Sequence, residues 1–235
     1  MGKVKKMLPK FCGFLFFGMM GTFVSAQKIS YQVNSQTGAL QTLSIANDPQ
    51  KMNWLVATDG SQYRWVKENY GWGLGYFTQI KGNRQDEIKQ EGNEVVYMAG
   101  DIRICVKRKM VGDELVEEYT FRNQGEDEVV LVDIGVYTPF NDNYPGSRTC
   151  INARTNTHIW EGENAAYINA LRMGGYAPHL GLVLTKGAVK SYEIWERGRD
   201  KGNSHTRGII TLNLPDLQLM PGKEYSISWC LFAQE

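Results

Sequence analysis

The chain has 235 residues and a formal net charge of +1, from 26 basic and 25 acidic side chains. Outside the first ten residues it has no Lys- and Arg-rich patch that would neutralise a row of phosphates. Nucleic acid is therefore not an expected partner.

The first 26 residues have the three-part layout of a secretory signal peptide. Residues 1–10 carry four Lys and no acid, residues 11–24 are apolar, and small residues precede Gln27. The apolar run is shorter than the roughly 20 residues that a membrane helix needs. We expect cleavage after Ala26, which removes four Lys and takes the net charge from +1 to −3. Export to the periplasm or the cell exterior follows, with no membrane insertion of the mature chain.

Alternation of apolar and polar residues dominates the rest of the chain and is typical of β-strands. It predicts strands over residues 28–34, 42–46, 94–99, 102–110, 115–123, 128–138, 180–185, 189–197, 208–214 and 223–232. Gly100-Asp101 lies between two of these runs and indicates a hairpin. Residues 116–136 look like a second hairpin.

No 12-residue window carries a clear helical stripe of apolar residues. Residues 164–175 come nearest, and alternation fits them as well as a helix does. We therefore predict an all-β protein, an antiparallel β-sandwich that forms a single domain over residues 27–235.

Three cysteines remain after the signal peptide: Cys105, Cys150 and Cys230. None belongs to a C-x-x-C pair, so no zinc site is expected. Cys105 and Cys230 lie in strand-like runs and read as buried free thiols. One disulfide with one thiol left over is the alternative for an exported protein. The loop 139–148 has few acids for a calcium site, and we expect neither a metal nor a cofactor.

Two stretches combine aromatic and polar residues, NYGWGLGYF at 69–77 and RTNTHIWEGEN at 154–164. Aromatic faces with a few polar neighbours are the usual composition of a ligand site, and flat rings stack on sugars. The candidate sugar-binding residues are Trp72, Asn141, Asn152, Arg154, His158 and Trp160. The alternative is that Trp72 and Trp160 are core residues of the sandwich.

The candidates for catalysis are His158, Glu161 and Glu163. His158 adjoins an aromatic stretch and is suited to proton transfer. Glu161 and Glu163 would share one face of a strand, where like charges raise one pKa. Two acids on one short stretch do not easily straddle a glycosidic bond, however. A solvated turn is the alternative for this pair.

Longer segments resemble a known family. The segments VVLVDIGVYTPFNDNY, NARTNTHIWEGENAAYINALRMGG and the closing PG-x-x-Y-x-x-x-W strand resemble the N-terminal supersandwich domain of bacterial polysaccharide-degrading enzymes. The resemblance implies a galactose-mutarotase-like β-sandwich that precedes an (α/α)6 barrel, with the main catalytic acids on the barrel. Here the chain stops at Glu235, where the sandwich is expected to end. We therefore expect a truncated or free-standing sandwich.

The leading hypothesis is an exported glycan-associated domain that is not catalytic alone. It would bind a poly- or oligosaccharide, or pack on the catalytic barrel of a glycoside hydrolase or lyase, which can be a separate chain. The alternative is a small carbohydrate-active enzyme, an epimerase or hydrolase, using His158 with Glu161 or Glu163. A third hypothesis is a structural envelope protein, which requires Trp72 and Trp160 to be buried.

Overall fold

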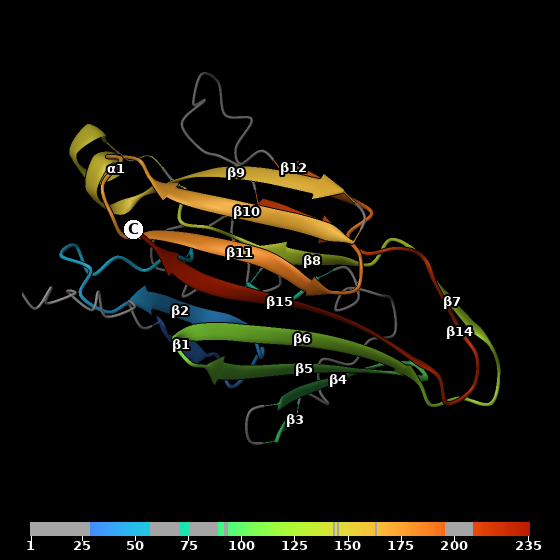
Figure 1. The fold of residues 1–235 in the computed structure, drawn as a ribbon. Helices are drawn as coiled ribbons and strands as arrows, with labels where there is room; N and C mark the ends of the chain where they lie inside the picture. Colours follow the sequence, from blue (N-terminus) through green and yellow to red (C-terminus); the bar gives the residue numbers. More distant parts are fainter. Residues whose placement is uncertain are drawn as a thin grey trace, which may run out of the picture.

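A computed structural model describes residues 29–56, 71–75, 89–91, 94–142, 144, 146–162, 164–195 and 209–235. The predicted signal peptide, the segment 57–70 and the candidate Glu163 lie outside these ranges. The described chain consists of antiparallel strands and a short helix (Figure 1). The all-β antiparallel fold predicted from the alternation is therefore confirmed.

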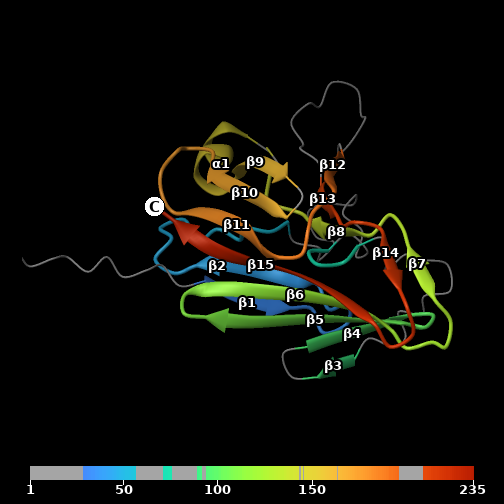
Figure 2. The same cartoon turned by 45° about the vertical axis from the view of Figure 1, so that its right-hand side comes forward.

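The largest sheet has eight strands in the order β3-β4-β5-β6-β15-β11-β10-β9. Its strands are β3 Lys89–Glu91, β4 Glu94–Ala99, β5 Ile102–Val111, β6 Glu114–Asn123, β15 Glu224–Gln234, β11 His179–Lys186, β10 Ala165–Arg172 and β9 Thr155–Gly162. Figures 1 and 2 show this sheet curving across the molecule from β9 to β3. The strand closest to the C-terminus, β15, lies in its centre between β6 and β11.

Smaller sheets complete the fold. They contain β1 Ile29–Val33 with β2 Leu40–Ile45, then β12 Ser191–Trp195, β13 Ile209–Asn213 and β8 Gly135–Thr138, and finally β14 Leu217–Leu219 with β7 Val129–Leu131. The helix α1, Ser147–Ala153, follows β8 and leads into β9. The helix was not predicted, because its seven residues are too few to show a periodic apolar stripe.

Burial follows the strand alternation. In β5 the residues Ile102, Ile104 and Val106 are buried, whereas Lys107 and Lys109 are exposed. Side chains at every second position lie on one face of a sheet. The large sheet therefore has an inner face that packs on the smaller sheets and an outer face that is more polar. The tryptophans at 54, 72 and 229 are fully buried in this core.

The hairpin predicted at Gly100-Asp101 is confirmed, because Ala99 pairs with Ile102 across the turn. Gly100 has φ 58°, a left-handed conformation that costs glycine little. The second predicted hairpin, over residues 116–136, is wrong. Both edges of β6 are already occupied, by β5 and β15, and β7 pairs with β14 instead.

The strand predicted over residues 128–138 is divided into β7 and β8. Asp133, between them, has φ 54°, which is incompatible with a continuous strand. Residues 164–175 resolve the ambiguity between helix and strand in favour of a strand, because β10 pairs with β9 over its full length. Within the described residues, no helix is long and apolar enough to cross a membrane.

Candidate functional site

Three of the predicted sugar-binding residues, Asn141, Asn152 and Arg154, lie around α1 and are engaged within the protein. Asn141 Nδ2 donates to the carbonyl of Asn53 at 2.7 Å, and Asn152 Oδ1 accepts from Tyr176 Oη at 2.9 Å. Arg154 Nη1 donates to the carbonyl of Ala153 at 2.5 Å. All three are partly buried. Their contacts order the helix and its flanking loops.

A buried ion pair lies under the same helix. Arg172 Nη2 is 2.7 Å from Asp48 Oδ1, and both side chains are fully buried. The guanidinium of Arg172 also lies over the rings of Trp54 and Tyr176, at 5.5 and 5.1 Å. A local sequence pattern does not indicate that two residues so far apart in the chain form an ion pair, so this pair was not predicted.

Trp72 is fully buried, which contradicts its prediction as a sugar-stacking residue. Its ring contacts Phe140 edge-on, and its Nε1 donates to Glu117 Oε2 at 2.8 Å. Neither face of the indole reaches the surface. The alternative interpretation, that Trp72 is a core residue, is correct.

Glu117 is the centre of a buried polar network that the sequence did not reveal. Its carboxylate accepts from Trp72 Nε1, from Trp229 Nε1 at 2.8 Å and from Arg108 Nε at 2.7 Å. Burial alone would lower the pKa of Arg108, but the adjacent Glu117 carboxylate, together with Tyr119 and Tyr97, outweighs it and raises that pKa. Burial also raises the pKa of Tyr119, and the charge of Glu117 adds to the rise. The network is inaccessible to solvent and has a structural role.

His158 and Trp160 lie on the outer face of the large sheet. They occupy alternate positions of the edge strand β9, and both are exposed. In the register of the sheet, Trp160 faces Tyr167 of β10, and His158 faces Asn169. The side chain of Trp160 is exposed by 49% and that of Tyr167 by 40%. These four residues are called the aromatic platform below.

The two rings of the aromatic platform lie nearly parallel. The ring centroids of Trp160 and Tyr167 are 5.9 Å apart, and the ring planes differ by 22°. A Cβ atom on Gly162 would lie 2.6 Å from Trp160 Cη2, so the indole lies over the backbone of this glycine. The two rings are therefore stacked on one another, and His158 and Asn169 lie on the same outer face of the sheet.

Polar and aromatic side chains continue the surface across the sheet. Gln234 Nε2 of β15 donates to Asn169 Oδ1 at 3.2 Å. The ring of Phe232 lies over Gly181 of β11, where a Cβ atom would be 2.6 Å from Phe232 Cζ. The sequence stretch around His158 did not point to Tyr167 or Asn169. Both could have been found by treating residues 165–172 as a strand, because Tyr167 and Asn169 then occupy alternate positions on one face.

The predicted pairing of His158 with Glu161 is wrong. The two residues are three positions apart on one regular strand, and residues at odd spacing lie on opposite faces of a sheet. Glu161 pairs with the buried Ala166, whereas His158 is on the outer face. Glu163 lies outside the described residues. No group of three or more His, Cys, Asp or Glu in the described chain is arranged to hold a metal ion.

Comparison with solved structures identifies proteins with a similar fold. The chain is similar to a polysaccharide lyase, with 52% sequence identity over 89% of this chain and a TM-score of 0.80. It spans 32% of the length of that lyase. It also resembles a galactose mutarotase related enzyme from Lactobacillus acidophilus, with 9% identity, a TM-score of 0.54 and coverage of 88% of this chain and 95% of that one. A scan against family models and a search among curated proteins gave no match.

These similarities confirm the resemblance that the sequence segments indicated. The chain has a galactose-mutarotase-like β-sandwich fold. It is the kind of sandwich found in polysaccharide-degrading proteins.

The three described cysteines, Cys105, Cys150 and Cys230, are free thiols. Burial, with the nearby Glu114, raises the pKa of Cys230 to about 11. Burial and the adjacent Glu94 also raise the pKa of Cys105. Elevated pKa values keep Cys105 and Cys230 protonated and poorly reactive at neutral pH.

Proposed function

We propose that this protein is an exported, glycan-associated β-sandwich that contributes to carbohydrate recognition and has no catalytic activity alone. The observation that carries the proposal is the aromatic platform on the outer face of β9 and β10. The 52% identity to a polysaccharide lyase supports carbohydrate as the ligand class. A poly- or oligosaccharide is the proposed ligand, and a catalytic barrel, in the same assembly, is the proposed partner.

The aromatic platform suits a pyranose because it offers an apolar face and polar groups at its edge. Neighbouring strands are about 4.8 Å apart, and the two ring centroids are separated by 5.9 Å. Trp160 and Tyr167 are therefore a stacked, partly exposed aromatic pair on two adjacent strands, to which the C–H face of a sugar can add. His158 and Asn169, two register pairs further along and on the same face, are placed to hydrogen-bond sugar hydroxyls.

The proposal of a non-catalytic role rests on what lies beside His158. Hydrolysis or elimination requires acid and base groups on the substrate side of the protein. Among the described residues of β9 and β10, none on the outer face is Asp or Glu. Asn169 is the cross-strand neighbour of His158. The described aromatic platform thus has groups that bind a sugar and lacks a carboxylate to work with the histidine.

The test measures retention and turnover together. The purified protein is applied to neutral and acidic polysaccharides in affinity gels, and sugar release is assayed in parallel. We expect retention without release. Trp160→Ala and Tyr167→Ala should each weaken retention about fivefold to tenfold, the effect of losing one aromatic contact and its buried area.

Tyr192→Ala is the matched control. Tyr192 of β12 is 39% exposed, close to the 40% of Tyr167, but it belongs to a different sheet. It should leave retention unchanged. Sugar release that disappears in His158→Ala would instead make the protein an enzyme and refute the non-catalytic role. Equal losses in Tyr167→Ala and Tyr192→Ala would refute the aromatic platform as the binding surface.

A further inference from the structure

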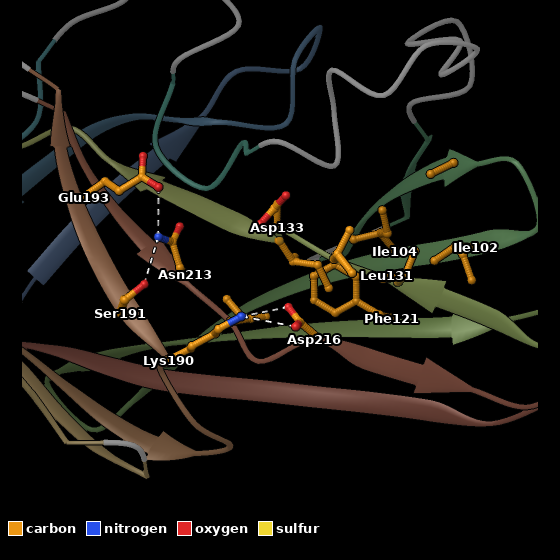
Figure 3. Close-up of a pocket in the computed structure, with 14 residues that line it drawn as sticks. Ile102, Ile104, Phe121, Leu131, Asp133, Lys190, Ser191, Glu193, Asn213 and Asp216 are labelled. Atoms are coloured by element: carbon orange, nitrogen blue, oxygen red, sulfur yellow. Dashed lines mark hydrogen bonds and ion pairs between the residues drawn. The ribbon is translucent and has the colours of Figure 1, made fainter.

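A cavity of about 750 Å³ opens at a second place in the fold. It lies where the ends of β4, β5 and β6 face the small sheet of β8, β12 and β13, next to the segment 131–134 (Figure 3). None of its lining residues comes from β9 or β10. The cavity is therefore separate from the aromatic platform.

The floor of the cavity is apolar. It is formed by Ile102 and Ile104 of β5, Phe121 of β6, and Leu131, Ile134 and Leu214. Most of these side chains belong to the core and expose only a small area. The floor is therefore a fixed surface. The volume of the cavity lies within the roughly 300–1,000 Å³ typical of small-molecule sites.

The walls carry polar groups, and most of these accept hydrogen bonds. Asn213 Nδ2 donates to Ser191 Oγ and to Glu193 Oε1, both at 3.2 Å. These two bonds orient the amide, and its Oδ1 is buried without a hydrogen-bond partner. This oxygen is closed off from the cavity, so the acceptors that this wall offers are Ser191 Oγ and the Glu193 carboxylate.

Charge in the cavity is predominantly negative. Asp133, Glu193 and Asp216 line it together with a single cation, Lys190. Lys190 Nζ is already paired with Asp216, at 3.1 Å. An anionic ligand would meet unfavourable carboxylates and find no unpaired cation among the lining residues.

Asp133 holds an unusual backbone conformation at this position. Its φ of 54° is in the left-handed region, which is uncommon for residues other than glycine. Such conformations gather at functional sites, where the surrounding structure maintains them. Figure 3 shows Asp133 between Asn213 on one side and Leu131, Ile104 and Phe121 on the other. The side chain of Asp133 therefore lies between the polar wall and the apolar floor.

We propose that this cavity is a second binding site and that it takes a neutral, hydroxyl-rich ligand of monosaccharide or disaccharide size. The apolar floor receives the C–H face of the ligand. Asp133 and Glu193 accept hydrogen bonds from its hydroxyls. The excess of carboxylates discriminates against uronic acids and other anions.

The experiment follows isoleucine δ1-methyl resonances of the protein during titration with D-galactose, lactose and D-galacturonate. Ile102, Ile104 and Ile134 line the cavity, and Ile168 of β10 is a buried reference that does not line it. We expect saturable shifts of the three lining methyl groups with at least one neutral sugar. D-galacturonate should bind at least about tenfold more weakly, because its charge faces the carboxylates.

Asp133→Gly is the informative variant, because glycine adopts the same φ without strain while the side chain and its carboxylate are removed. It should weaken neutral-sugar binding about tenfold and reduce the discrimination against D-galacturonate. Trp160→Ala should leave these shifts unchanged, which separates this site from the aromatic platform. An unshifted Ile168 resonance confirms that each variant is folded.

The proposal is overturned by three outcomes. They are the absence of lining-methyl shifts with both neutral sugars, binding of D-galacturonate as tight as that of the neutral sugars, and unchanged affinity in a folded Asp133→Gly variant. If that variant does not fold, the comparison of neutral and acidic sugars on the unaltered protein decides.

Discussion

Replacing Glu117 with Gln should destabilise the protein by about 3–5 kcal/mol, the cost of breaking a buried ion pair from one side. The carboxylate of Glu117 is fully buried and is 2.7 Å from Arg108 Nε. Glutamine has nearly the same shape but removes the negative charge. The guanidinium of Arg108, 2% exposed, would then remain charged without its counter-ion.

The indole groups increase this cost. Trp72 Nε1 and Trp229 Nε1 both donate to Glu117 Oε2 at 2.8 Å. The carboxylate offers two acceptor oxygens to these donors, whereas a glutamine amide offers only one. At least one buried donor therefore loses its partner. An orphaned buried donor costs about 1–3 kcal/mol. The whole protein is expected to have a stability of about 5–15 kcal/mol, so the variant should be close to unfolding.

Urea unfolding followed by tryptophan fluorescence measures this loss as a change in the midpoint. The control is Glu118→Gln, the same substitution one residue along β6. Glu118 is on the other face of the sheet, and its ion pair with Lys186 is long, at 3.9 Å, and exposed. That variant should lose less than about 1 kcal/mol. Equal losses in the two variants would refute the reasoning about the buried network.

Two further predictions concern the aromatic platform and pH. Gly162→Ala places a Cβ atom 2.6 Å from the Trp160 ring and must tilt it, so polysaccharide retention should fall severalfold. Gly146→Ala, where a Cβ atom meets nothing within 4 Å, should leave retention unchanged; equal effects would show that the ring does not depend on Gly162. Burial, with the nearby positive charge of Arg172, lowers the pKa of His179, and the unfolded chain then binds more protons. The contribution of His179 is therefore present above about pH 6.5 and lost as pH falls below it. His179→Asn keeps an acceptor for the backbone N–H of Arg172, and it should flatten the fall in urea midpoint between about pH 6.5 and 5; an unchanged slope would contradict this assignment.

The local sequence pattern was sufficient to predict most strands and the fold class, because the alternation of apolar and polar residues and the turn residues are local properties of the chain. The failures have non-local causes. The second hairpin was predicted from adjacency, but β6 is paired on both edges by strands that are adjacent to it only in space. The strand over 128–138 is interrupted because Asp133 takes a left-handed conformation, which its residue type permits and does not require.

The candidate site was predictable only in part. His158 and Trp160 stood out as a polar and an aromatic residue two apart, and the structure places both on the outer face of β9. Trp72 was misassigned because a buried indole and an exposed one look alike in sequence. Its partner Glu117 is 45 residues away. Tyr167 and Asn169 become part of the aromatic platform through cross-strand register, which residue patterns alone do not specify.

The most direct test of carbohydrate recognition is a crystal structure of the protein with an oligosaccharide from a polysaccharide that it retains. We expect a sugar ring stacked on the exposed part of Trp160 or Tyr167, with hydroxyls within hydrogen-bond distance of His158 or Asn169. A glycan bound elsewhere on the molecule, with both rings left uncovered, would contradict the proposed role of the aromatic platform.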